Sequence, residues 1–138
     1  MDYKFELVMI PVTDVDRAKH FYAEQAGFQL DVDTMVNPEM RVVQLTPPGS
    51  ACSIVFGTGM SEMPPGSIQG MHLVVTDIDA AYKELHGRGV GVSEVRHLVD
   101  GVWKAGAHPH HMDYNSFSEF KDPDGNGWIL QERGYERR

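Results

Sequence analysis

The sequence predicts an α+β fold in which two βαβββ modules form paired, curved mixed sheets around a cavity. Three observations support this prediction: a helix-start motif occurs twice, a helical pattern of apolar residues follows each copy, and three strand-like segments follow each helix. We expect the first module over about residues 4–58 and the second over about residues 70–133. A half of roughly 60 residues buries only a marginal core, so the modules should pack together as one domain, residues 1–138.

The repeated motif fixes the position of both helices. Residues 12–18 (VTDVDRA) recur as residues 75–81 (VTDIDAA), 63 residues further along the chain, and five of the seven positions are identical. Both copies follow an apolar run. Thr13 and Thr76 are the expected N-caps, each with an aspartate three residues later in the manner of a capping box.

Apolar residues at helical spacing follow each copy of the motif. They are Val15, Ala18, Phe21 and Tyr22 in the first helix and Ile78, Ala81 and Leu85 in the second. Gly27 is expected to end the first helix, and Gly87 or Gly89 the second, because glycine tolerates the left-handed backbone angles of a helix end.

Short apolar segments bounded by turn residues predict the strands. The expected strands are 5–10, 28–32, 41–45 and 53–56 in the first module and 73–75, 90–95, 116–121 and 128–132 in the second. Turns at 47–50 and 122–127 join the last two strands of each module. The stretch 59–70, rich in Gly, Pro, Ser and Met, separates the modules.

Composition and charge narrow the range of functions. The hydrophobic fraction of 41% and the charged fraction of 23% are those of a soluble globular protein. No apolar run approaches the roughly 18 residues of a membrane span, and the first residues lack a signal-peptide pattern. The single cysteine, Cys52, has no partner for an internal disulfide, so we expect a cytoplasmic protein. The net charge of −8 argues against nucleic acid as a partner.

Three parts of the sequence resemble a known family. They are the repeated Val-Thr-Asp-hydrophobic-Asp-x-Ala helix start, the helix end from Phe21-Tyr22 to Gly27-Phe28, and the hairpin 122–126 (DPDGN). Together they resemble the glyoxalase/bleomycin-resistance, or vicinal oxygen chelate, superfamily from about Phe5 to Glu132. Residues 41–50 and 127–132 are similar to a bacterial branch known only as glyoxalase-like. The resemblance implies the fold but not the chemistry, because function depends on the site.

The resemblance also implies where a metal would be bound. Enzymes of the superfamily hold one divalent metal with four side chains, usually His and Glu, and the metal acts as a Lewis acid on two neighbouring substrate oxygens. The four corresponding positions here hold Leu7, Ser53 or Ile54, Met71 and Ile129. His72 is expected on the opposite, helix-facing side, because a shift of one residue along a strand reverses the direction of the side chain. We therefore expect no bound metal and no cofactor.

Two glutamines are candidates for orienting a ligand in the cavity. Gln131 has the strand parity of Ile129 and should face the cavity, and Gln44 is expected there too. Amides in an apolar pocket commonly orient a ligand, although they serve equally well as buried structural groups. The cavity wall is expected to consist of Leu7, Met9, Gln44, Met71, Leu73 and Gln131.

A histidine-rich segment, residues 97–114, is expected to form a long connection that roofs the cavity. It contains His97, His108, His110 and His111. Imidazoles can bind Zn, Ni or Cu, yet a polar surface loop is the simpler interpretation. Long loops are often lids, and in that role the segment would contribute Trp103, His108 or Tyr114 to the ligand site.

Two functions remain open at this point. The first is a homodimeric binding module that holds a small amphipathic or aromatic molecule without a metal, through Gln44, Trp103, His108, Tyr114 and Gln131. The second is a metal-dependent lyase, isomerase or dioxygenase with a rearranged site, or an enzyme with a metal-free acid–base pair drawn from His97, His108 and Glu119. A homodimer is expected because the sheet edges of one chain need cover.

Overall fold

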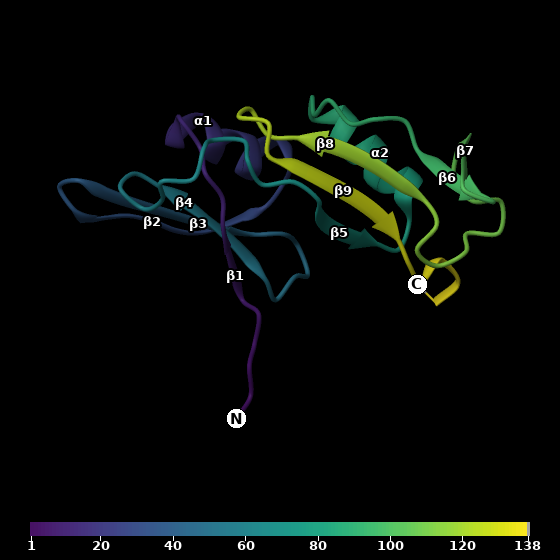
Figure 1. The fold of residues 1–138 in the computed structure, drawn as a ribbon, viewed down its shortest axis with the longest axis horizontal. Coiled ribbons are helices and arrows are strands. Elements are labelled where there is room, and N and C mark those ends of the chain that lie inside the picture. The colour runs from purple at the N-terminus through teal and green to yellow at the C-terminus, as the bar shows by residue number, and fades with distance from the viewer. Residues whose placement is uncertain (138) are drawn as a thin grey trace. The chain divides into compact units, whose positions relative to one another are not determined.

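The computed structural model describes residues 1–137. Its packing divides the chain into two compact units: the first contains Met1–Ile68 and Asp122–Asn126, and the second contains Gln69–Lys121 and the residues from Gly127 onward. Each unit has one mixed sheet (Figure 1), so the predicted α+β class is confirmed. The packing of the two units into one domain stays a prediction. None of the helices within residues 1–137 is long and apolar enough to cross a membrane.

The first unit is built on a four-stranded sheet with the order β1-β4-β3-β2. Its strands are β1 (Leu7–Met9), β2 (Gln29–Asn37), β3 (Met40–Thr46) and β4 (Ser53–Gly57). β1 runs parallel to β4, and the other pairs are antiparallel. The predicted turn between β3 and β4 closes with a hydrogen bond of 3.0 Å from the Ser50 amide to the Pro47 carbonyl.

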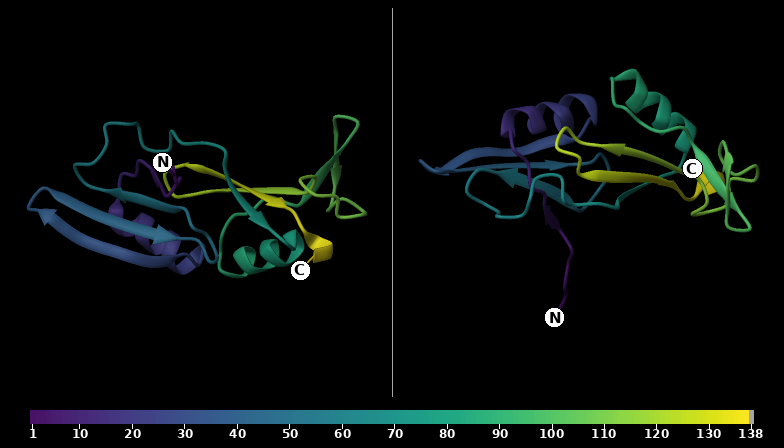
Figure 2. Two further views of the ribbon diagram at one scale, coloured as in Figure 1. Left: turned by 90° about the horizontal axis from the view of Figure 1, so that it is seen from below. Right: turned by 45° about the horizontal axis from the view of Figure 1, so that its top comes forward.

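Two short helices, α1 (Val15–His20) and η1 (Phe21–Gln25), pack on one face of this sheet (Figure 2). The predicted apolar face is confirmed, because Val15, Ala18, Phe21 and Tyr22 are all buried. η1 is a π-helical turn in which the Ala26 amide donates to the Phe21 carbonyl at 2.8 Å. The wider turn keeps both aromatic rings in the core, where Tyr22 lies 5.9 Å from Phe56 between ring centroids.

Both major helices begin at an aspartate rather than at the predicted threonine. The N-caps are Asp14 and Asp77, whose side chains accept a hydrogen bond from the backbone amide three residues later, at 3.0 and 3.1 Å. The prediction of Thr13 and Thr76 as caps is therefore wrong by one residue. Thr13 has another partner, since its hydroxyl donates to Asp124 Oδ1 at 2.6 Å.

The second unit is built on a five-stranded sheet with the order β5-β9-β8-β6-β7. Its strands are β5 (Met71–Val75), β6 (Arg96–Val99), β7 (Val102–Ala105), β8 (Phe117–Lys121) and β9 (Gly127–Glu132). β5 runs parallel to β9, and the other pairs are antiparallel. Helix α2 (Ile78–Gly87) packs on one face of this sheet, with Ile78 and Leu85 buried (Figure 2). The short 3-10 helix η2 (Tyr135–Arg137) follows β9.

The segment between α2 and β8 differs from the prediction. Residues 90–95, predicted as a strand, have no regular secondary structure, and Val90 and Val95 are buried anchors on either side of an exposed stretch. The strand falls instead on β6, which forms a hairpin with β7. Asp100 and Gly101 make the turn with φ angles of 50° and 77°. An Asp-Gly pair is a strong hairpin signal, so the sequence did contain the evidence for these strands.

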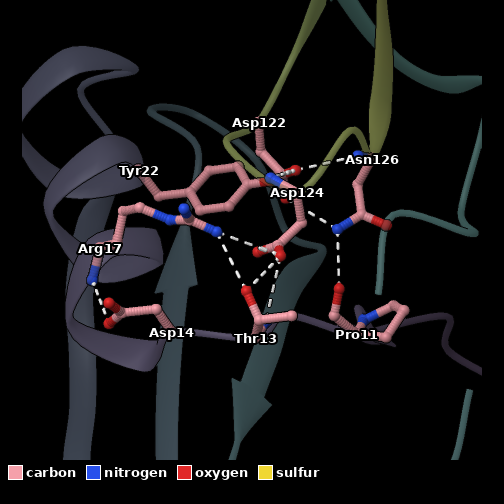
Figure 3. A network of polar contacts seen from close by, with 8 residues as sticks. All are labelled: Pro11, Thr13, Asp14, Arg17, Tyr22, Asp122, Asp124 and Asn126. Atoms are coloured by element: carbon pink, nitrogen blue, oxygen red, sulfur yellow. Dashed lines mark hydrogen bonds and ion pairs between the residues drawn. The ribbon is translucent and has the colours of Figure 1, made fainter. Parts of the chain in front are cut away.

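The turn between β8 and β9 belongs to the first unit by its packing, and Figure 3 shows its polar contacts. Buried Asp122 accepts hydrogen bonds at 2.8 Å from the Tyr22 hydroxyl and from the Asn126 amide group. Its other oxygen accepts from the backbone amides of Asp124 and Asn126, both at 2.9 Å. The Asn126 side chain also donates to the Pro11 carbonyl at 2.9 Å. Hydrogen bonds to a buried carboxylate are among the strong ones, so this turn is a structural anchor.

Candidate functional site

The exposed side of the five-stranded sheet is the candidate functional site. Along β9, Trp128, Leu130 and Glu132 are buried, whereas Ile129 and Gln131 are partly exposed. Residues paired in register point to the same face, so the neighbours of Ile129 and Gln131 on adjacent strands share their direction. We call this side the open face. Its members on the strands are His72, Val74, Arg96, Leu98, Trp103, Phe117, Glu119, Lys121, Ile129 and Gln131.

The open face corrects the prediction for β5. His72 pairs with Ile129 and Val74 with Gln131, so His72 lies on the open face and is exposed. Met71 and Leu73, predicted to line the cavity, point to the helix-covered face. The error came from a slip of one residue in matching the two modules. At the repeat distance of 63, His72 is the equivalent of Met9, which also points away from the helices. The His72 Nδ1 atom lies 2.7 Å from the Gly70 carbonyl oxygen.

Gln131 lies on the open face, as its strand parity predicts. Its amide group donates to the Tyr114 carbonyl at 3.1 Å, so the residue fixes the backbone of the histidine-rich segment beside β9. Tyr114 has a φ of 65°, an unusual value for a bulky residue, and its ring is half exposed. The Arg133 guanidinium lies 5.6 Å from the centroid of that ring. Two of the predicted ligand residues, Gln131 and Tyr114, are therefore neighbours.

An aromatic corner occupies the part of the open face formed by β6, β7 and β8. Trp103 and Phe117 meet edge to face, with ring centroids 5.5 Å apart and an interplanar angle of 88°. The Arg96 guanidinium lies over the indole, with its carbon 3.9 Å from the centroid of Trp103. Its Nη2 atom is 3.5 Å from Glu119 Oε1. Trp103 remains 43% exposed, which leaves this large ring available for contact with another molecule.

The histidine-rich segment is held by its own hydrogen bonds. His108 Nδ1 accepts from the His110 amide at 3.1 Å, so its neutral ring carries the proton on Nε2 and lacks a free lone pair for a metal. Buried His97 has its Nδ1 atom 2.7 Å from the Gly106 carbonyl oxygen, and its ring meets that of His108 edge to face at 5.6 Å. These contacts favour a structured connection over a metal site. The part of the segment from 102 to 105 is strand β7 rather than loop.

A buried carboxylate joins this segment to helix α2. Glu132 is fully buried and accepts hydrogen bonds from the Ile78 amide at 2.9 Å and from His111 Nδ1 at 2.8 Å. The His111 ring stacks on Tyr135 with centroids 3.7 Å apart. Two residues past each partner of this bond, Asp113 accepts from the Gly134 amide at 2.7 Å. This hydrogen bond, aided by Arg137, lowers the pKa of the Asp113 carboxyl group.

The four-stranded sheet of the first unit also has a side without helices. Leu7, Met9 and Gln44 lie on that side, because Leu7 pairs with Ser53 while Met9 and Gln44 both pair with Val55. Ile54 points the other way and is buried. Thus three of the predicted cavity residues share one face of this sheet. Gln44 is partly buried.

The donors on these two sheet faces do not fit the metal site of the superfamily. The predicted ligand positions Leu7, Ser53 and Ile129 face the open sides of the sheets and offer no strong ligand for a divalent metal. His72, next to the predicted position Met71, supplies the one imidazole beside them. Within residues 1–137, no group of three or more His, Cys, Asp or Glu side chains is arranged to hold a metal ion. Three or four such ligands are the usual requirement for tight binding.

A cleft of about 630 Å³ extends along the second unit beside the open face. Glu119, Lys121 and Ile129 line it from β8 and β9, while Gly70 and Ser93 line it from the segments next to them. A volume of this size is typical of a small-molecule site. Sequence reasoning proposed Trp103, Tyr114 and Gln131 as ligand residues but did not consider Arg96 and Phe117. These two lie near Trp103 because the Asp100-Gly101 turn brings β7 back along β6.

Two mixed sheets, each with helices on one face and a partly apolar open side, define an α+β protein of the vicinal oxygen chelate type. The chain belongs to the Glyoxalase/Bleomycin resistance protein/Dioxygenase superfamily, whose model matches residues 4–130.

Similar proteins come from several bacteria. The chain is 32% identical to TnmS3, an antibiotic binding protein from Streptomyces sp. CB03234, over 95% of this chain and 96% of that one, with a TM-score of 0.74. A superfamily member from Sphaerobacter thermophilus is 30% identical over 96% and 98% of the two chains, with a TM-score of 0.73. The uncharacterized protein YetH of Bacillus subtilis is 28% identical, over 91% of this chain and 94% of YetH.

Proposed function

We propose that this chain is a cytoplasmic, homodimeric binding protein that holds a small aromatic or amphipathic molecule on the open face without a bound metal. The observation that carries the proposal is the exposed aromatic corner of Trp103 and Phe117 beside the amide of Gln131. Exposed aromatic rings next to a few convergent polar groups are typical of small-molecule sites. Tyr114 and His108 belong to the adjoining segment. Gln44, on the sheet of the first unit, stays a predicted ligand residue.

The likeness to TnmS3 supports a binding role. That protein is an antibiotic binding protein, and the likeness extends over nearly the whole of both chains. A ligand with a flat, largely apolar skeleton suits the aromatic corner, because offset or edge-to-face contacts with Trp103 and Phe117 would replace water on both rings.

Two features of the side chains support binding without a metal. The predicted ligand positions hold Leu7, Ser53 or Ile54, Met71 and Ile129, and the one imidazole beside them is that of His72. Two histidines of the histidine-rich segment already use Nδ1 in hydrogen bonds, His108 with the His110 amide and His111 with Glu132. The free thiol of Cys52 suits a reducing compartment such as the cytoplasm.

A second candidate function is catalysis by a metal-free acid–base pair. His72, Ile129 and Glu119 lie at one level across β5, β9 and β8, so an imidazole and a carboxylate flank Ile129 on the open face. Such a pair could move a proton on a bound substrate. Glu119, however, is 54% exposed in its side chain and paired with Arg96, which favours the binding role.

A ligand screen and a metal analysis together test the proposal. Anthraquinone-2-sulfonate and doxorubicin, as flat aromatic probes, should raise the melting temperature, since a ligand at 100 times its Kd stabilises by about 2.7 kcal/mol. Trp103→Ala should abolish the shift, and Tyr82→Ala on α2 serves as the control.

Elemental analysis of untagged protein should give well under one equivalent of Zn, Ni or Fe per chain. A full equivalent lost in His72→Ala, or turnover of a probe, would favour the enzyme.

Light scattering tests the dimer separately. A mass of two chains at micromolar concentration is expected, because uncovered strand edges such as β5 and β7 favour association with a second copy. A monomer mass would contradict this part of the proposal and leave the ligand site as it stands.

A further inference from the structure

The open face carries a charge opposite to that of the whole chain. The chain has 20 acidic and 12 basic residues and a net charge of −8. On the strands of the open face, however, there are two cations, Arg96 and Lys121, and one carboxylate, Glu119. Arg133 lies just beyond β9, with its guanidinium over Tyr114 and its charge partly balanced by the Asp113 carboxylate. A local excess of positive charge in an acidic protein attracts anionic ligands to this face.

Arg96 is placed to bind an anion beside a flat ring. The guanidinium carbon of Arg96 lies 3.9 Å from the centroid of the Trp103 ring, and its Nη2 atom lies 3.5 Å from Glu119 Oε1. A guanidinium has five N–H donors, so several remain for a further acceptor. Because these contacts already orient the guanidinium, binding of a ligand costs little conformational entropy of the Arg96 side chain.

We propose that the ligand of the open face is a planar aromatic anion, with its ring in the corner of Trp103 and Phe117 and its negative group on Arg96. This inference rests on the proposed function and adds the chemical class of the ligand. The ring would contact the indole that is 43% exposed, and its carboxylate, sulfonate or phenolate would accept the free N–H donors of Arg96. Lys121 and Arg133 would add long-range attraction.

Three probes distinguish the contribution of a flat ring to binding from the contribution of a negative charge. Naphthalene-2-carboxylate is flat and anionic, naphthalene-2-carboxamide is flat and neutral, and cyclohexanecarboxylate is anionic but not flat. The chain has two tryptophans, and Trp128 is only 4% exposed, so quenching of tryptophan fluorescence reports contact at Trp103. The flat carboxylate should bind tightest, and Trp103→Phe should remove most of the quenching. Calorimetry gives the Kd of each probe.

Arg96→Gln is the decisive variant, and Arg88→Gln is its matched control. Both arginines are about equally exposed and each pairs with a glutamate, but Arg88 lies at the end of α2. Loss of a charged hydrogen-bond partner should weaken binding of the flat carboxylate about tenfold or more. Binding of the carboxamide should change less than twofold, and Arg88→Gln should change neither.

The outcomes distinguish this inference from the proposed function. Equal binding of carboxylate and carboxamide, both unaffected by Arg96→Gln, would overturn the inference and leave an aromatic binding protein. Failure of all three probes to bind, together with failure of the screen above, would overturn the proposed function itself. If Arg96→Gln does not fold, the salt dependence of binding by the unmodified protein provides the test. Its preference for the carboxylate over the carboxamide must be present at low salt and fall as the salt concentration rises.

Discussion

The two modules begin their helices with nearly the same sequence, yet different side chains secure the two starts. In the first, Thr13 and Arg17 donate to Asp124 of the Asp122–Asn126 turn (Figure 3). In the second, the first amide of α2, that of Ile78, donates to buried Glu132. The comparison shows that the repeat specifies the Asp14 and Asp77 caps, whereas the tertiary anchors are different residues in the two modules.

The anchors also differ in what lies beyond them. Asp122 and Asn126 tie the turn to Tyr22 and Pro11, all within the first unit, and no group there belongs to the candidate site. Glu132 ties α2 to His111, six residues before Phe117 of the open face. The first anchor should therefore affect stability alone, and the second should affect both stability and the order of the histidine-rich segment.

Asp122→Ala should have the largest effect. It removes four hydrogen bonds to a buried carboxylate and leaves the Tyr22 hydroxyl without this acceptor. The free energy of unfolding should fall by about 3–4 kcal/mol, as measured by urea denaturation. The control is Asp79→Ala, at an exposed position in the first turn of α2, with an expected change within about 0.5 kcal/mol. A loss below about 1 kcal/mol for Asp122→Ala would show that the turn is not an anchor.

Glu132→Leu tests the second anchor. The leucine leaves the Ile78 amide and the His111 ring without their acceptor, so the free energy of unfolding should fall by about 2–3 kcal/mol. Hydrogen exchange should also become faster at His110 and Met112, whose amides depend on the ordered segment. Unchanged exchange in this segment would mean that the other contacts hold it without Glu132.

A pair of threonine variants isolates the difference between the two helix starts. Thr13→Val should cost about 1–1.5 kcal/mol, because it removes the bond to Asp124 and an acceptor for Arg17. Thr76→Val, at the equivalent and exposed position of the second module, should change the free energy of unfolding by less than about 0.5 kcal/mol. Equal losses in thermal or chemical denaturation would contradict the assignment of Asp124 as a partner specific to the first module.

The smallest effect concerns an ion-pair cluster of the first module, in which Lys19 and Arg41 both contact Asp33. Hydrogen bonds from Arg41 and Lys19 hold the pKa of Asp33 well below its ordinary value of 3.8. The folded state therefore binds fewer protons here than the unfolded state, so the contribution of Asp33 is complete above about pH 5 and is lost as the pH falls below its unfolded pKa. Asp33→Asn should make the stability of the protein less sensitive to acid between about pH 5 and 3. An unchanged acid profile would show that the cluster contributes nothing measurable, as is common for exposed pairs.

The elements of the fold could be predicted where two signals agreed. The motif at 12–18 and 75–81 gave both helices, and the 122–126 turn before an apolar run gave β8 and β9. The stretch 90–95 misled the prediction because Val90, Val92 and Val95 give it the composition of a strand. It forms no regular ladder and makes isolated backbone hydrogen bonds, such as those from Ser93 to Glu119 and from Gly106 to Val95. The Asp100-Gly101 signal was stronger and marked the true strands.

The candidate site could be predicted only in part. The direction of Gln131 follows from the clear alternation of β9 from Trp128 to Glu132, and its role toward a ligand stays a prediction. Trp103 and Tyr114 were identified as polar-tipped aromatic residues in an unusual segment, but nothing in the sequence places Arg96 over Trp103 or Phe117 at its edge. Such contacts join residues on three strands, and their partners depend on register, which is a property of the sheet.

The sequence by itself determined the two modules, the helix faces and the existence of two alternating sets of residues on each strand. The tertiary structure decided which set faces outward. In β5 the run Met71-His72-Leu73-Val74-Val75 has apolar residues in both sets, so the pattern alone favours neither face. The parallel pairing of His72 with Ile129 settles the direction, because register to a neighbour with a clear alternation transfers that neighbour's faces to the ambiguous strand.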